Sequence, residues 1–196
     1  MAKLKKEIFV LGLFFFVFNL HGQDIKGFYE LGIKEMESGD DVFAVYYFTK
    51  GIEAGHDNSS EGITFLAYIY HERGRCKFRL GDQLGSFSDF TKSIELTENI
   101  LENNNFDSEN IKLVSNMLSF NFYHRAKLNE RKKNLNNALL DINHAINLNK
   151  NDSEYFIFRG SLNLLLNQKK MACLDFSKAG DLGDGRAYEK IRENCN

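Results

Sequence analysis

Small, apolar and polar residues recur in a fixed order along this chain. The segment 138–145 (ALLDINHA) and the segment 172–179 (ACLDFSKA) carry equivalent residues 34 positions apart. Two earlier segments, 86–93 and 44–51, repeat the same order of a small, a bulky and a small residue at i, i+4 and i+7. Positions spaced by three or four lie on one face of a helix, so each segment is predicted to be a helix that buries this face.

A second pattern lies upstream of each of these segments. An aromatic residue is followed four positions later by glycine or alanine, in the pairs Phe28 and Gly32, Tyr70 and Gly74, Phe122 and Ala126, and Phe156 and Gly160. The small residue lets a partner helix approach closely, and the aromatic ring fills the adjoining gap. The chain is therefore predicted to be a series of helix–turn–helix units.

Glycine and aspartate mark the turns inside the first two units. Gly39 and Gly81 are predicted to end the first helix of each pair, and Asp40 and Asp82 are suited to cap the second.

A 34-residue helix pair of this kind resembles the tetratricopeptide repeat. The resemblance places four copies at 25–58, 67–100, 119–152 and 153–186, and it implies an all-α, right-handed α-solenoid. Two features depart from the family pattern. The usual tyrosine three positions after the small residue is replaced by Glu35, Lys77, Asn129 and Asn163, and the closing proline is absent from all copies.

The spacing between copies is uneven. The distance from copy 1 to copy 2 exceeds the period by 8 residues, and the distance from copy 2 to copy 3 exceeds it by 18. The longer insertion, about 101–118, is predicted to be a projecting hairpin made of two lengthened helices, and a flexible hinge between two repeat pairs is the alternative. Residues 185–194 are predicted to form a helix that caps the last repeat.

The amino terminus has the features of an export signal. Lys3, Lys5 and Lys6 precede an apolar run of 13 residues from Ile8 to Leu20, which is too short to span a membrane. Residues 1–22 are therefore predicted to be a signal peptide and residues 23–196 the repeat domain. The protein would be exported to the periplasm or secreted, with an uncleaved anchor as the alternative.

Composition and charge exclude several functional classes. Hydrophobic residues make up 43% and charged residues 27%, as in a globular protein, and the formal net charge is −2. Nucleic acids require clustered cations, so they are not expected as partners. After export, the three cysteines could include one bridge, Cys173 with Cys195, and Cys76 is expected to be a buried free thiol.

Catalytic and metal-binding signatures are missing from the sequence. There is no GxSxG, HExxH, GxGxxG or P-loop motif, so no enzymatic activity, cofactor or metal is expected. His71, His124 and His144 are interpreted as groove or surface residues. Three arginines and three aspartates recur with the repeat, and repetition favours structural ion pairs between helices over catalysis. They are Arg73, Arg125, Arg159, Asp89, Asp141 and Asp175.

The resemblance also implies a binding surface. Ligands of tetratricopeptide repeats commonly lie in the concave groove lined by the first helices. The matching positions in copies 2 and 3 are Tyr68, His71, Arg75, Phe78, Arg79, Phe120, Tyr123, Lys127, Glu130 and Arg131. Aromatic and basic residues dominate this set, which suits an extended peptide that carries carboxylates. The alternative is a solvated face covered by the inserted hairpin.

The sequence thus predicts an exported module that binds or scaffolds a protein or peptide partner. A self-associating assembly protein is the alternative, because Ile157, Leu164 and Leu165 could bury a neighbouring chain. An enzyme of unrecognised type is the third possibility.

Overall fold

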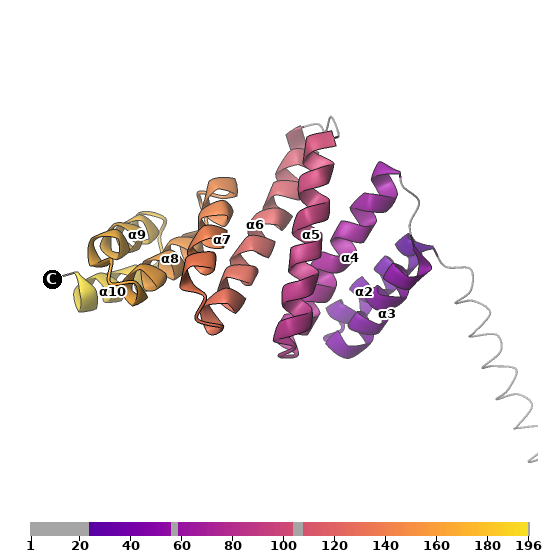
Figure 1. Ribbon diagram of the computed structural model, residues 1–196, viewed down its shortest axis with the longest axis horizontal. Coiled ribbons are helices and arrows are strands. Elements are labelled where there is room, and N and C mark those ends of the chain that lie inside the picture. The colour runs from indigo at the N-terminus through magenta and orange to yellow at the C-terminus, as the bar shows by residue number, and fades with distance from the viewer. Residues whose placement is uncertain (1–23, 56–58, 104–107, 196) are drawn as a thin grey trace, which may run out of the picture.

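The computed structural model describes residues 24–55, 59–103 and 108–195, which form helices arranged in successive antiparallel pairs (Figure 1). The predicted all-α class is confirmed. The signal peptide expected at residues 1–22 lies outside the described residues. The helices are α2 (Ile25–Glu37), α3 (Asp41–Ala54), α4 (Ser60–Arg79), α5 (Gln83–Asn103), α6 (Ser108–Arg131), α7 (Leu135–Leu148), α8 (Ser153–Leu165), α9 (Lys169–Asp181) and α10 (Arg186–Asn194). Within the described residues, no helix is both long enough and apolar enough to cross a membrane.

Each first helix packs on the second helix of its own repeat, and each second helix packs on the first helix of the next (Figure 1). Most of the inserted segment 101–118 belongs to the adjoining ends of α5 and α6, which extend past the ends of α4 and α7 (Figure 1). Ile100 of α5 and Met117 of α6 are buried in one cluster with Ala67 of α4. Continuous packing therefore joins the second repeat to the third.

The small residues of the first helices receive a bulky residue from the second. A side chain at Gly32, Gly74 or Gly160 would meet the ring of Phe48, Phe90 or Phe176, at 2.3, 3.0 and 2.5 Å respectively. All three rings are fully buried. In the third repeat the equivalent positions are Ala126 and Ile142. Alanine is larger than glycine and isoleucine is smaller than phenylalanine, so the two differences offset each other. Close helix contact thus depends on the sum of two side-chain volumes.

The turns inside the first two repeats follow the sequence-based expectation. Gly39 and Gly81 adopt φ angles of 86° and 83°, in the left-handed region that glycine tolerates best. Asp40 Oδ1 accepts a hydrogen bond from the Phe43 backbone N–H at 3.0 Å, and Asp82 caps α5 in the same way.

In the third and fourth repeats the same turn is made without glycine. Lys133 and Asn167 adopt φ angles of 61° and 59°. The residues that follow them, Asn134 and Gln168, form no side-chain cap. These two turns therefore have neither the glycine nor the aspartate cap of the first two.

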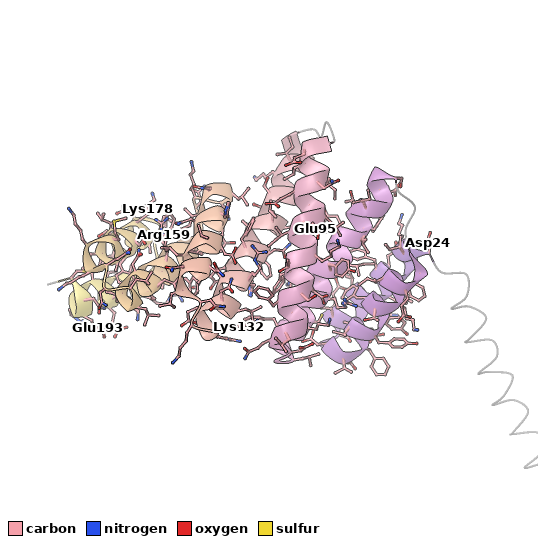
Figure 2. All side chains as sticks on the ribbon, in the orientation of Figure 1. Asp24, Glu95, Lys132, Arg159, Lys178 and Glu193 are labelled. Atoms are coloured by element: carbon pink, nitrogen blue, oxygen red, sulfur yellow. A yellow bond between two sulfur atoms is a disulfide. The ribbon has the colours of Figure 1, made fainter. Side chains whose placement is uncertain are left out.

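The recurring arginines and aspartates form ion pairs inside each repeat, which confirms their structural interpretation. Arg73, Arg125 and Arg159 donate two or more hydrogen bonds each, to Asp89, Asp141 and Asp175 respectively, with shortest distances of 2.7, 2.6 and 2.6 Å. Of these residues, Figure 2 labels Arg159. Three of the four positions that depart from the family tyrosine contact the same carboxylates: Lys77 contacts Asp89, Asn129 contacts Asp141, and Asn163 contacts Asp175.

The first repeat lacks this ion pair. Leu31 stands where the arginine would be, and Tyr47 stands where the aspartate would be. The replacement removes both charges together, so no buried charge is left unpaired.

The C-terminal helix is fixed to the last repeat by a covalent bond and by apolar packing. A disulfide joins Cys173 of α9 to Cys195, which follows α10, and their Cα atoms are 5.7 Å apart. Ala187 of α10 is fully buried against the core, and Ile191 packs on it. Cys76 is a buried free thiol, and burial raises its pKa to about 12.

Candidate binding surface

A cavity of about 540 Å³ opens between the first helices of repeats 1, 2 and 3. Its lining comes from α2, α4 and α6: Tyr29, Phe65, Tyr68, His71, Glu72, Leu113, Asn116, Met117 and Phe120. The Tyr29 ring packs edge-on against Phe65, with centroids 5.8 Å apart, and lies 6.2 Å from the Tyr68 ring. Burial raises the pKa of Tyr29 to about 12. The cavity is therefore an aromatic site with uncharged tyrosines at neutral pH.

The last residues of the inserted segment 101–118 form one wall of this cavity. Leu113, Asn116 and Met117 come from the extended start of α6. Leu113 is 56% exposed, so a large apolar side chain here faces solvent at the edge of the cavity. The insertion borders the first-helix face and leaves the cavity accessible.

A row of cations over aromatic rings continues from the cavity. The Arg75 guanidinium lies 5.3 Å from the centre of the Phe120 ring, and Arg131 lies 4.9 Å from the centre of Phe78. Lys127 Nζ lies 5.7 Å from the same Phe78 ring. Ring faces attract cations, so these side chains are held in place along the surface.

The three cations differ in their partners. Arg75 Nη1 donates to Glu72 Oε2 at 2.8 Å, whereas Lys127 and Arg131 have no carboxylate within ion-pair distance among the described residues. Burial raises the pKa of Glu72 and Arg75 opposes this shift. Lys127 and Arg131 thus offer positive charge without a direct ion pair beside the aromatic cavity.

Two histidines pack against the aromatic rings of this surface, and one of them, His71, also lines the cavity. His71 is 7% exposed, and its Nδ1 is 2.6 Å from the side-chain oxygen of Asn121. The His124 ring lies 4.0 Å from Phe120 and 4.8 Å from Phe78, and its buried Nδ1 has no hydrogen-bond partner among the described residues. Burial lowers the pKa of His71 to about 4 and that of His124 to about 3, so both are neutral at neutral pH.

Comparisons with known proteins give matches in structure but none in sequence. No family model matches the sequence, and no curated protein matches it. The structure is similar to a crystal structure of MamA protein, with a TM-score of 0.66 and 16% identity over 85% of this chain and 78% of that one. A second MamA structure has a TM-score of 0.62 and 14% identity, covering 84% of this chain and 81% of that chain.

The helix pairs of this chain, their repeat spacing and the structural similarity to MamA all indicate the same fold. The chain has the tetratricopeptide-repeat fold. A structure of the APC/C hetero-tetramer Cut9-Hcn1 also matches, with a TM-score of 0.67 and 12% identity, and the match covers 88% of this chain and 30% of that chain.

The tetratricopeptide fold brings together most of the predicted groove residues. Tyr68, His71 and Phe120 line the aromatic cavity. Arg75, Phe78, Lys127 and Arg131 form the adjoining row of rings and cations. Glu130 lies beside this row on α6 and is partly exposed.

Two predicted groove residues have structural partners instead. Arg79 forms an ion pair with Asp41 of α3, and its Nε donates to Asp41 Oδ2 at 2.7 Å, so it joins repeat 2 to repeat 1. Tyr123 is 6% exposed, and its hydroxyl donates to Glu154 Oε1 at 2.8 Å. Both residues hold neighbouring repeats together.

The structure places the three histidines differently, and it corrects one apolar residue. His71 is buried but lines the cavity, His124 is half-buried, and His144 is exposed, with its ring stacked on Phe122 at 4.9 Å. Ile157 is 8% exposed and belongs to the core, so the apolar surface suggested for self-association is reduced. The described residues contain no group of three potential metal ligands.

The sequence-based set omits several residues that form the cavity. Leu113, Asn116 and Met117 lie in the insertion, where no repeat position exists from which to assign them. Phe65 lies before the start of copy 2 at residue 67. An apolar i, i+4 spacing, Leu113 with Met117, is the signal that could have found this wall.

Proposed function

We propose that this protein is an exported scaffold that binds an extended segment of a partner protein on the first-helix face of repeats 1 to 3. The observation that carries the proposal is the aromatic cavity bordered by Leu113 and continued by the cations Lys127 and Arg131, which form no direct ion pair within the described residues. Export is supported by the lysine-rich start and the short apolar run in residues 1–22.

The chemistry of the surface defines the ligand. A large apolar side chain of the partner would enter the cavity against Tyr29, Tyr68 and Leu113. Carboxylates next to it along the partner chain would pair with Arg75, Lys127 and Arg131. Burial of one aromatic side chain contributes roughly 1.5–3 kcal/mol, and each charge-assisted hydrogen bond contributes about 1.5–3 kcal/mol where water is excluded.

One of the proteins with a similar structure assembles with another protein. The Cut9 chain that is similar to this one occurs in a hetero-tetramer with Hcn1. That observation concerns Cut9, and it is compatible with a scaffold role for the present chain.

A random peptide library displayed on phage tests the proposal. Selected peptides should combine a large apolar residue with nearby Asp or Glu, and Leu113→Ser should weaken their binding about tenfold. Leu165→Ser is the matched control, because Leu165 is 57% exposed, against 56% for Leu113, and lies on α8 outside the cavity. Fluorescence anisotropy with the selected peptides gives both affinities.

The proposed pairing of these cations with carboxylates of the partner is tested separately by the double variant Lys127→Gln with Arg131→Gln. This double variant leaves the structural ion pair of Arg79 intact, and it should weaken binding and reduce the dependence of affinity on salt. Selected peptides that bind the Leu113→Ser protein as tightly as the wild type would place the site elsewhere.

A further inference from the structure

Two of the recurring arginines also join adjacent repeats. Arg73 Nη1 donates to Thr49 Oγ1 of the preceding repeat at 3.0 Å. Arg159 Nη1 donates to Asn143 Oδ1 of its preceding repeat at 2.8 Å. Each guanidinium therefore uses one side for its own aspartate and its remaining nitrogen for the neighbouring second helix.

The same bond is not made between repeats 2 and 3. Arg125 binds Asp141 through Nε and Nη2, at 3.0 and 2.6 Å, and within the described residues its Nη1 has no hydrogen-bond partner. Thr91, at the position of Thr49 and Asn143, instead lines a cleft that also contains Arg125. Arg125, which lines this cleft, thus has one hydrogen-bond donor without a partner in the described structure.

The cleft has a volume of about 760 Å³ and lies between second helices α5 and α7, with α6 as its floor (Figure 1). It shares only α6 with the aromatic cavity, and its other walls come from different helices. Its α5 wall runs from Phe87 to Glu102, a rise of 15 residue steps or about 22 Å of helix. An extended peptide of about six or seven residues matches this length.

The charge of the cleft is negative along one wall. Glu95 (labelled in Figure 2), Glu98 and Glu102 line it from α5. Glu95 pairs with Lys92 at 2.8 Å, and the Asp141 charge is matched by Arg125. Glu98 and Glu102 have no cation within ion-pair distance in the described part of the chain.

We propose that this cleft binds an extended, basic segment of a protein partner, with two cationic side chains at alternate positions. Glu98 and Glu102 are four residues apart on one helix, so their side chains start about 6 Å from each other. Alternate side chains of an extended chain are about 6.6 Å apart on one side, which matches this spacing. A main-chain carbonyl of the same segment accepts the hydrogen bond from Arg125 Nη1.

The opposite wall suits the stems of those side chains. Leu140 of α7 is 60% exposed, and the exposed His144 ring stacks on Phe122 of the floor. Lysine and arginine stems pack on such apolar surface while their charged ends reach carboxylates. The proposal is independent of the first-helix site, because the two surfaces share no lining residue.

Anisotropy with a fluorescein-labelled peptide, Gly-Ala-Lys-Ala-Lys-Ala-Gly, tests the proposal on the purified chain. The double variant Glu98→Gln with Glu102→Gln should bind about tenfold more weakly than the wild type. The matched control is Glu30→Gln with Glu37→Gln, which removes two exposed charges on α2 and should leave the affinity unchanged.

Peptide spacing and the first-helix variant complete the test. A peptide with adjacent lysines should bind at least threefold more weakly, and Leu113→Ser should bind the Lys-Ala-Lys peptide as the wild type does. Equal binding by the Glu98→Gln, Glu102→Gln protein overturns the proposal, and so does equal binding of a Glu-Ala-Glu peptide. Neither result depends on whether the aromatic cavity binds its own ligand.

Discussion

The close contact between Gly160 of α8 and Phe176 of α9 gives a sharp test of how these repeats pack. A Cβ atom at Gly160 would lie 2.5 Å from Phe176 Cε1 and 2.8 Å from Cδ1, closer than side chains approach without movement. The fully buried ring has no solvent-filled space to move into. Overpacking costs about 1–3 kcal/mol, and the gain in helix propensity from glycine to alanine is about 1 kcal/mol. Gly160→Ala should therefore destabilise the protein by up to about 2 kcal/mol.

The third repeat supplies the compensating change. It has Ala126 and Ile142 at the positions of Gly160 and Phe176, and both are fully buried. Phe176→Ile alone should leave a cavity and cost about 1–2 kcal/mol. Combined with Gly160→Ala it should recover at least about 1 kcal/mol relative to the sum of the single changes.

Urea unfolding followed by far-UV circular dichroism measures these free energies of unfolding, with the disulfide kept intact. Gly180→Ala is the matched control in α9, because its nearest new contact, Ala187 Cβ, is at an ordinary 3.6 Å. It should stabilise the helix by about 0.5–1 kcal/mol. If Gly160→Ala were more stable than the wild type, or if the double variant were additive within about 0.5 kcal/mol, the reasoning about paired volumes would be wrong.

Two further predictions concern pH and the disulfide. The pKa values of His71 and His124, about 4 and about 3, lie below the unfolded value near 6.5, so the unfolded chain binds more protons in this range. The free energy of unfolding should fall as pH drops from 6.5 towards 4, by up to about 1.4 kcal/mol per pH unit for each histidine. In thermal melts at several pH values, the stability of His124→Phe should depend less steeply on pH than that of the wild type. Reduction of the Cys173–Cys195 bridge, which closes a 22-residue separation, should cost about 3 kcal/mol in the chain-entropy model. Hydrogen exchange should locate this loss in α10, and an unchanged α10 on reduction would contradict it.

The sequence pattern predicts the helix pairs well because their packing is local. An aromatic residue, a small residue four positions later and a bulky partner in the next helix repeat in nearly the same form, so the pattern itself states the contact. The Arg159–Asp175 pair is predictable for the same reason, because its 16-residue separation recurs in each of the last three repeats.

Contacts that occur once could not be found in this way. Asp41 lies 38 residues before Arg79, and no other repeat carries that pair, so an arginine of the predicted groove proved to be structural. Leu113 lies in an insertion without a repeat register. The burial of His124 depends on Phe78 and Phe90 from another repeat, which periodicity within one helix does not report.

The missing ion pair of the first repeat makes the solenoid asymmetric in its folding. Repeat stability is roughly a sum of internal terms and contacts with neighbours, so a terminal repeat without Arg–Asp pairing is the weakest unit, whereas the opposite end is closed by a disulfide. Local opening should therefore begin in α2 and α3. Tyr29 of α2 belongs to the aromatic cavity, so this cavity is complete only while the least stable repeat is folded. A partner bound at the proposed first-helix site would therefore also stabilise the amino-terminal repeat, because its binding and the opening of that repeat would be linked equilibria.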